Sequence, residues 1–315
     1  MSVLVYTESW NGNFRKSSFE AVSYASETAK LLGTDVVAIS LGVVSDDELN
    51  KLGNYGASRV ISCAEIEKGD SQATSAMIAE LAIDATIIIF SNTYTAKMIA
   101  PRLSAKLKAG SISNIISLAE STSPIKVKRK SFSSKAIETT IVTTDKAILS
   151  ILPNSFGLIE TGRSCAIETI AAAEKGSITI EGQETASGKI SLSEAEIIVS
   201  AGRGLKGPEN WGMIEELAEV LGAATACSKP VADIGWRPHS EHVGQTGKAV
   251  TADLYIAIGI SGAIQHLAGV NSSKVMVVIN TDPEAPFFKA ADYGIVGDAF
   301  EVVPQLIEEI KKLKN

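Results

Sequence analysis

The first part of the chain alternates short apolar runs with amphipathic stretches. Short runs rich in Val and Ile predict strands, and apolar positions spaced at i, i+3 and i+4 predict helices. The predicted strands are Ser2–Thr7, Asp35–Leu41, Arg59–Cys63 and Ala85–Ser91. The predicted helices are Ser17–Leu32, Ser71–Ala82 and Thr93–Leu107. This alternation of strand and helix favours a doubly wound sheet of parallel strands.

The pattern changes after the helix that ends at Leu107. Ile125–Arg129 and Glu138–Leu152 alternate or cluster like antiparallel strands and carry few helical signals. Gly176–Lys189 is then enriched in Gly, Ser, Thr, Glu and Gln. We therefore predict a domain boundary near residue 187, with one domain over 1–187 and a second over 188–315.

The second part of the chain restarts the alternation of strand and helix. Its predicted strands are Glu196–Ala201, Tyr255–Ile260, Lys274–Asn280 and Gly294–Gly297. Its predicted helices are Trp211–Leu221, one that starts at about Gly262, and Pro304–Lys314. The sequence therefore predicts an α/β protein with two Rossmann-like, doubly wound domains and mainly parallel sheets.

Composition narrows the class of protein. Of 315 residues, 45% are hydrophobic but only 5% are aromatic, so aliphatic side chains dominate the core and an aromatic platform for nucleic acid is not expected. A net charge of −7 also argues against a nucleic-acid partner. The three cysteines lie far apart and suit a reducing compartment. No apolar run approaches the ~18 residues of a membrane span, so we expect a cytoplasmic protein without membrane insertion.

Gly202–Gly207 matches the pattern GxGxxG between a predicted strand and a predicted helix. In dinucleotide-binding folds such a turn lets the backbone approach a pyrophosphate. However, Pro208 and Glu209 follow the third glycine directly, and no strand ending in an acidic residue is evident about 20 residues later. Three interpretations stay open here: a nicotinamide-dinucleotide fingerprint, a phosphate turn clamped by Arg203, and a plain turn.

Two further glycine turns lie downstream. Gly244–Lys248 resembles the end of a P-loop, but His242 stands where the first glycine belongs and Ala249 where a hydroxyl belongs. Gly259–His266 joins a strand to a helix, and its exposed N–H groups and Ser261 suit an anion. Neither segment carries a nucleophile elbow or a metal-ligand set, so we predict no catalytic residue and no metal site.

Taken together, several blocks resemble the signature segments of the electron transfer flavoprotein alpha subunit. They are Gly202–Lys206, Val243–Lys248, Leu254–Gly269, Ile279–Pro286 and Ala291–Asp298. The resemblance covers nearly all of residues 196–315, whereas the first part of the chain fits the family's architecture without a comparable signature. Long blocks in a fixed order are far more specific than a single glycine motif.

The resemblance implies an FAD-binding second domain and a first domain that packs against the beta subunit of a heterodimer. Such a complex accepts electrons from acyl-CoA or other dehydrogenases, as in fatty acid beta-oxidation, and passes them to a quinone reductase or another acceptor. The chain would then be an electron carrier, not an enzyme, and AMP or a second FAD would belong to the beta subunit. An NAD-dependent oxidoreductase that uses Gly202–Gly207 and a non-redox nucleotide-binding subunit stay open as alternatives.

The resemblance also implies roles for individual residues. Arg203 would contact the pyrophosphate, Ser228 and Thr246 would lie at the isoalloxazine ring, and His266 would lie by its C2 carbonyl. Ser261–Gln265 would cradle the phosphates and ribityl chain, with Asn280 and Asp298 on the adenosine side. The complete predicted cofactor-binding set is Arg203, Ser228, Lys229, Val243, Gly244, Gln245, Thr246, Ser261, Gly262, Ala263, Ile264, Gln265, His266, Asn280, Asp298 and Ala299.

We expect these cofactor-binding residues to control the charge near the flavin ring. A cation close to N1 and O2 favours the anionic form of a one-electron-reduced flavin, and we expect Arg203, Lys229 and His266 to supply positive charge. The family commonly has Arg where this chain has Lys229. A guanidinium is planar and stacks on rings, whereas an ammonium is a compact, hydrated charge, so the flavin potentials are expected to differ.

Overall fold

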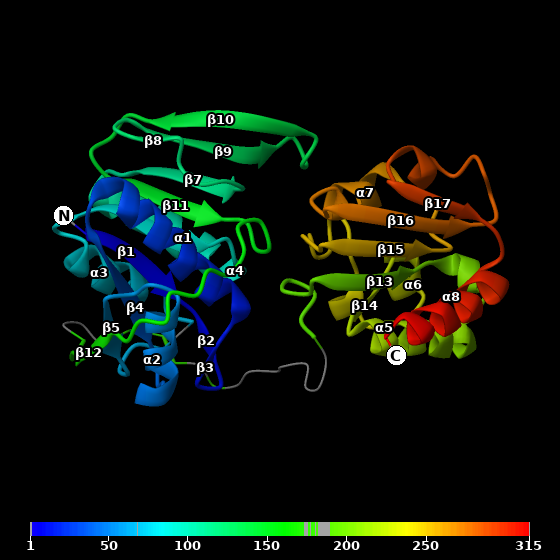
Figure 1. The fold of residues 1–315 in the computed structure, drawn as a ribbon, viewed down its shortest axis with the longest axis horizontal. Helices are drawn as coiled ribbons and strands as arrows, with labels where there is room; N and C mark the ends of the chain where they lie inside the picture. The colour runs from blue at the N-terminus through cyan, green and yellow to red at the C-terminus, as the bar shows by residue number, and fades with distance from the viewer. Residues whose placement is uncertain are drawn as a thin grey trace. The chain divides into compact units, whose positions relative to one another are not determined.

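The computed structural model describes residues 2–67, 69–172, 176, 178–179, 181 and 190–314. They form two compact units, one built mainly from residues 2–181 and one mainly from residues 190–314 (Figure 1). The predicted boundary near residue 187 falls in 182–189, which lies outside the described residues. Among the described residues, no helix combines the length and apolar character needed to cross a membrane.

The first unit contains a ten-stranded sheet in the order β10-β9-β7-β11-β6-β1-β4-β5-β12, with β8 paired to β9. The strands from β7 to β12 in this order pair in parallel. They are β7 (Gly110–Ile115), β11 (Ala147–Ile151), β6 (Ala85–Ser91), β1 (Ser2–Thr7), β4 (Asp35–Leu41), β5 (Arg59–Cys63) and β12 (Ala166–Thr169). The antiparallel strands are β8 (Ser121–Thr122), β9 (Ile125–Ser131) and β10 (Ala136–Val142). A separate pair joins β2 (Ser9–Trp10) and β3 (Asn13–Phe14).

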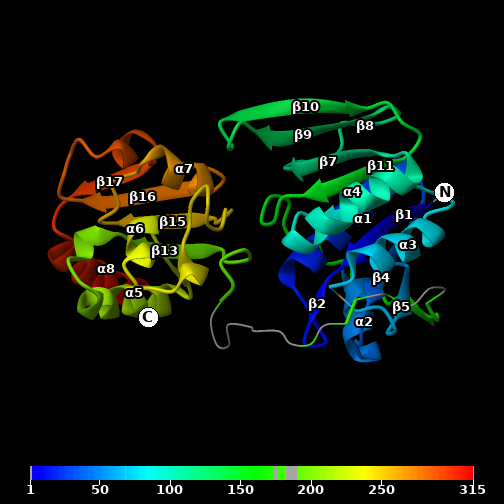
Figure 2. The ribbon, with the colours of Figure 1, turned by 180° about the vertical axis from the view of Figure 1, so that it is seen from behind.

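Helices cover both faces of this sheet because successive strand side chains point to opposite sides. On β1, Val3 and Val5 face the core under α1 (Lys16–Leu32) and α2 (Asp46–Asn54). Leu4 and Tyr6 face the core under α3 (Ser71–Leu81) and α4 (Tyr94–Leu107). Figure 2 shows the α3 and α4 side of the sheet.

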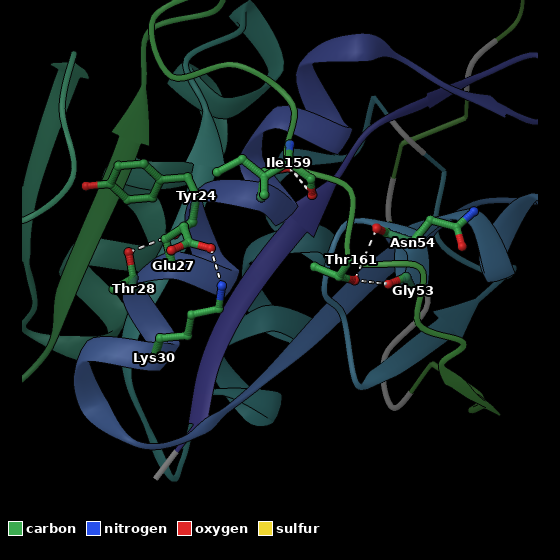
Figure 3. Close-up of polar contacts among 9 residues, drawn as sticks. Tyr24, Glu27, Thr28, Lys30, Gly53, Asn54, Ile159 and Thr161 are labelled. Atoms are coloured by element: carbon green, nitrogen blue, oxygen red, sulfur yellow. Dashed lines mark hydrogen bonds and ion pairs between the residues drawn. The ribbon is translucent and has the colours of Figure 1, made fainter.

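The segment after β11 runs back across the helices before it enters β12. The N–H of Ile159 donates to Oγ of Ser23 at 3.0 Å. The Thr161 hydroxyl donates to the carbonyl oxygens of Gly53 and Asn54 at 3.2 and 3.1 Å (Figure 3). These contacts tie the segment to α1 and α2 and bring β12 to the edge of the sheet.

The second unit contains five parallel strands in the order β14-β13-β15-β16-β17. They are β14 (Ala224–Cys227), β13 (Ile197–Ala201), β15 (Leu254–Ile258), β16 (Val275–Asn280) and β17 (Tyr293–Val296). α5 (Gly212–Leu221), α6 (Lys229–Asp233) and α8 (Ala299–Lys314) pack on one face with Val199 and Ala201. α7 (Ile264–Val270) packs on the other face with Ile198. Both units are therefore α/β and mainly parallel, which confirms the predicted fold class.

One strand prediction was wrong in direction. Glu138–Leu152 divides into β10, which is antiparallel as expected, and β11, which pairs in parallel with both β6 and β7. All five residues of β11 are buried. A central parallel strand reads as a continuous apolar run, which by periodicity alone looks the same as a buried antiparallel strand.

Several short elements were missed, and two helix starts were displaced. The missed helices and strands are short or polar and carry weak periodic signals; they are α2, β2, β3, β7, β8, β12, β14 and α6. α8 begins at Ala299 and not at Pro304, because Asp298 caps its first turn. α7 begins at Ile264 because Gly262 has a φ of 84°, which is not a helical conformation.

Candidate cofactor site at the carboxyl edge of the second sheet

The strand order of the second sheet reverses at β13. The chain passes from β13 to β14 on one side and returns to β15 on the other. In open α/β sheets, ligands bind at the carboxyl ends of the strands where the order reverses in this way. The loops that follow β13 and β15 are therefore the expected centre of a ligand site.

The structure brings most of the predicted residues to this carboxyl edge. Arg203 follows β13, Ser228 and Lys229 follow β14, and Ser261–His266 follows β15, while Asn280 ends β16 and Asp298 and Ala299 follow β17. All five strands are parallel, so these positions meet at one edge although they span nearly a hundred residues of sequence. Parallel pairing therefore explains why residues so distant in sequence form one candidate site.

A sixth loop, Val243–Thr246, is held against the same edge by backbone hydrogen bonds. The N–H of Val243 donates to the carbonyl of Cys227 at 3.0 Å, at the end of β14. The N–H of Gln245 donates to the carbonyl of Gln265 at 2.7 Å, in the first turn of α7. The loop thus lies beside the Ser261–His266 turn, with the side chains of Gln245 and Thr246 exposed.

The glycines after β13 are required by close packing of two turns. A Cβ on Gly202 would lie 2.3 Å from the carbonyl oxygen of Gly259, and one on Gly204 would lie 2.6 Å from the Cα of Gly259. Arg203–Leu205 forms a short 3-10 turn, and α5 begins only at Gly212. The GxGxxG pattern therefore does not open directly onto a helix, as a nicotinamide-dinucleotide fingerprint requires.

The predicted residues differ in exposure. Arg203, Lys229, Gln245, Thr246, Ser261, Ala263, Ile264 and Gln265 are exposed. Ser228, Val243, Gly244, Gly262, His266 and Ala299 are buried, and Asn280 and Asp298 are half-buried. The cations and most hydroxyls are thus accessible to a ligand, while the buried members shape the loops that carry them.

Two predicted contacts on the adenosine side already have partners within the protein. Nδ2 of Asn280 donates to the carbonyl of Ile260 at 3.1 Å, and its Oδ1 accepts from the N–H of Asp282 at 3.0 Å. Asp298 accepts from the N–H of Phe300 at 3.0 Å and lies 3.7 Å from Nζ of Lys206. Both side chains therefore stabilise the loops after β16 and β17, whatever ligand the edge binds.

His266 differs from its expected charge state. Burial, with a smaller contribution from the nearby His242, lowers the pKa of its imidazole from 6.5 to about 4. The ring is therefore neutral near pH 7 in this chain, so it does not supply the positive charge that we expected. Burial likewise lowers the pKa of His242, an effect to which Lys229 contributes.

Sequence reasoning missed the aromatic residues around His266. Tyr255 and Phe287 are fully buried, and the Tyr255 hydroxyl lies 2.9 Å from Nε2 of His266. The two six-membered rings stack at 6.4 Å with an angle of 7° between their planes. In the sequence, Tyr255 is one residue of an apolar strand and carries no signal that separates it from core packing.

The side chains at this edge fit a flavin dinucleotide. Arg203 and Lys229 offer positive charge for a pyrophosphate, and Ser228, Thr246 and Ser261 offer hydroxyls. Nδ1 of His266 is buried without a hydrogen-bond partner among the described residues, so it is free to bond a polar group of a ligand. In the part of the chain that the structure describes, no group of three His, Cys, Asp or Glu side chains could hold a metal ion.

Comparison with known proteins agrees with this geometry. Residues 191–271 match the electron transfer flavoprotein FAD-binding domain, and residues 3–175 match the electron transfer flavoprotein domain. The match to the FAD-binding domain supports FAD as the cofactor, as the resemblance implied.

Similar proteins extend over almost the whole chain. The electron transfer flavoprotein subunit alpha of Bacillus subtilis is 41% identical, with 99% of this chain and 98% of the relative covered. The subunit of the same name from Paracoccus denitrificans is 38% identical, with 97% and 99% covered. That from Syntrophomonas wolfei is 35% identical, with 98% of each chain covered. The chain therefore belongs to the electron transfer flavoprotein alpha-subunit family.

Proposed function

We propose that the second unit holds one FAD along the carboxyl edge of its sheet and that the chain is the alpha subunit of a heterodimeric electron carrier. The observation that carries the proposal is the convergence of six loops with cationic, hydroxyl and amide groups at a single parallel edge. The position of that edge at the reversal of strand order supports it. The names of the relatives, all subunit alpha, support a beta subunit as the partner.

In this proposal the residues of the chain bind and orient the cofactor. Arg203, exposed in the turn after β13, holds the pyrophosphate together with the backbone of Ser261–Gln265. Ser228 and Thr246 offer hydroxyls to the ring, and Lys229 keeps a positive charge near it. When bound, FAD supplies the redox chemistry, since it can accept two electrons and release them one at a time.

The same proposal describes an electron carrier without an organic substrate of its own. Its donors would be acyl-CoA or other dehydrogenases, as in fatty acid beta-oxidation, and its acceptor a quinone reductase or a comparable protein. Residues 1–187 would contact the beta subunit, which would also hold AMP or a second FAD. The three cysteines are free, which supports a cytoplasmic location.

Co-expression of this chain with its beta subunit tests the proposal. The purified complex should be yellow, with a flavin absorbance spectrum that bleaches on reduction, and one FAD per alpha chain should be released on denaturation. A colourless complex that binds NADH would favour the oxidoreductase alternative. A colourless complex that binds adenine nucleotides would favour a non-redox subunit. Neither alternative is favoured by the geometry of the Gly202–Gly207 turn or by the family.

A further inference from the structure

His266 forms an aromatic cluster with Tyr255 and Phe287. Tyr255 lies on β15 and His266 on α7, while Phe287 lies in the short turn Pro286–Lys289. Tyr255 and Phe287 are fully buried, and His266 is 7% exposed. The cluster is tied to the candidate site, because the N–H of Phe287 donates to the carbonyl of Ser261 at 3.1 Å. A change in the cluster can therefore reach the loops of the site directly.

Among the described residues, the imidazole has a 2.9 Å hydrogen bond between its Nε2 and the Tyr255 hydroxyl, and the backbone of Val243 acts on the ring more weakly. A neutral imidazole has one donor nitrogen and one acceptor nitrogen, and the hydrogen bond at one nitrogen decides which of them carries the proton. The Tyr255 phenol keeps its proton at neutral pH, since burial raises its pKa. It can therefore donate that proton to an acceptor nitrogen.

We propose that Tyr255 is a positioning residue for His266: its hydroxyl donates to Nε2 and thereby holds the neutral ring in one tautomer, with its proton on Nδ1 and available to the bound cofactor. The proposal rests on the proposed function, because it assigns His266 to the flavin site. It explains why Nδ1, buried and without a partner among the described residues, is retained as a polar atom next to the site. His266 then acts as a neutral hydrogen-bond donor and not as a cation.

Nitrogen NMR of the full chain in complex with its beta subunit tests this assignment. The chain has three histidines, so selective ¹⁵N labelling gives few signals, and a His266→Gln variant identifies those of His266. At pH 7 the native protein should show a protonated Nδ1 and an unprotonated Nε2. A proton on Nε2 in the unmodified protein would overturn the proposal without any variant.

Removal of the hydroxyl gives the second arm. In Tyr255→Phe, which keeps the ring and its packing, His266 should become a mixture of tautomers and its pKa should rise by about one pH unit. Tyr293→Phe loses the same hydroxyl from an exposed position on β17 and should leave His266 unchanged. An unchanged tautomer and pKa in Tyr255→Phe would reject the role of Tyr255.

The absorbance spectrum of the same samples separates the two claims. A flavin spectrum together with an unchanged tautomer in Tyr255→Phe would contradict only the positioning role. A complex without flavin would contradict the proposed function, while the NMR signals would still report whether Tyr255 sets the tautomer.

Discussion

The carboxylate of Asp298 accepts a hydrogen bond of 3.0 Å from the backbone N–H of Phe300, so the residue predicted to contact adenosine also caps α8. Asp298→Ala should remove the cap and lower the free energy of unfolding by about 1 kcal/mol. Asp298→Asn should keep the cap but lose the charge, because Asn caps helices as well as Asp does. Urea unfolding measures the free energy that the cap contributes to stability, and FAD retention after dialysis measures the contribution of the carboxylate to cofactor binding. Weaker retention in Asp298→Asn at native stability would assign the carboxylate to the cofactor, whereas full retention would leave it the structural role alone.

Arg203 offers a cleaner test of the site, because its exposed side chain contributes little to folding. Arg203→Ala should leave the free energy of unfolding within about 0.5 kcal/mol of the parent. It should nevertheless weaken FAD retention by at least about tenfold, since a charge-assisted hydrogen bond to phosphate contributes roughly 1.5–3 kcal/mol. Arg102→Ala makes the same change at an exposed position in the first unit and serves as the control. Full FAD occupancy of Arg203→Ala after extended dialysis would contradict the role.

Lys229 is exposed at the first position of α6, directly after the end of β14. Lys229→Arg keeps the charge but introduces a planar guanidinium that can stack on a ring. A one-electron potential changes by about 59 mV for each tenfold change in relative affinity for two oxidation states, so we expect a shift of tens of millivolts. Redox titration of the parent and variant complexes measures the shift. Identical potentials would show that the shape of the cation at this position does not matter.

His266 should make the stability of the FAD-free chain depend on pH. Its pKa falls from 6.5 to about 4 on folding, so between these values the unfolded chain binds the extra proton. Stability should therefore be complete above about pH 6.5 and fall as pH drops towards 4, by at most about 3 kcal/mol. Urea unfolding at intervals of pH measures this slope. His266→Gln should flatten it, whereas His239→Gln, at an exposed position, should not.

Close packing of the turns after β13 and β15 predicts intolerance at Gly204. Gly204→Ala places a methyl group 2.6 Å from the Cα of Gly259, and backbone atoms cannot move aside cheaply. We expect a loss of about 1–3 kcal/mol in the free energy of unfolding. Gly212→Ala is the matched control, since nothing lies within 4 Å of its added methyl and its φ of −54° is helical. It should be neutral or slightly stabilising. Equal thermal stability of the two variants would contradict the packing argument.

Much of the fold could be predicted because its longer elements repeat local patterns. β1, β4, β5 and β6 have the predicted bounds, and α1, α3 and α4 differ by a residue at one end. The direction of β11 could not be predicted, because its apolar run is compatible with either pairing. The short β14 and α6 were not predicted, because short segments owe most of their stability to neighbouring elements and their own residues carry little signal.

The sequence by itself determined the α/β class, the family and the residues to consider for FAD. The class follows from strand and helix periodicities, and the family and its residues follow from the blocks that resemble the family; both are local features of the chain. Only the tertiary structure decided that the loops after five parallel strands meet at one edge, and that the Gly202 turn is packed against Gly259. It also decided that His266 is neutral, since the charge of an imidazole depends on burial and on charged neighbours such as His242. Those contacts join residues far apart in the chain, and no local pattern records them.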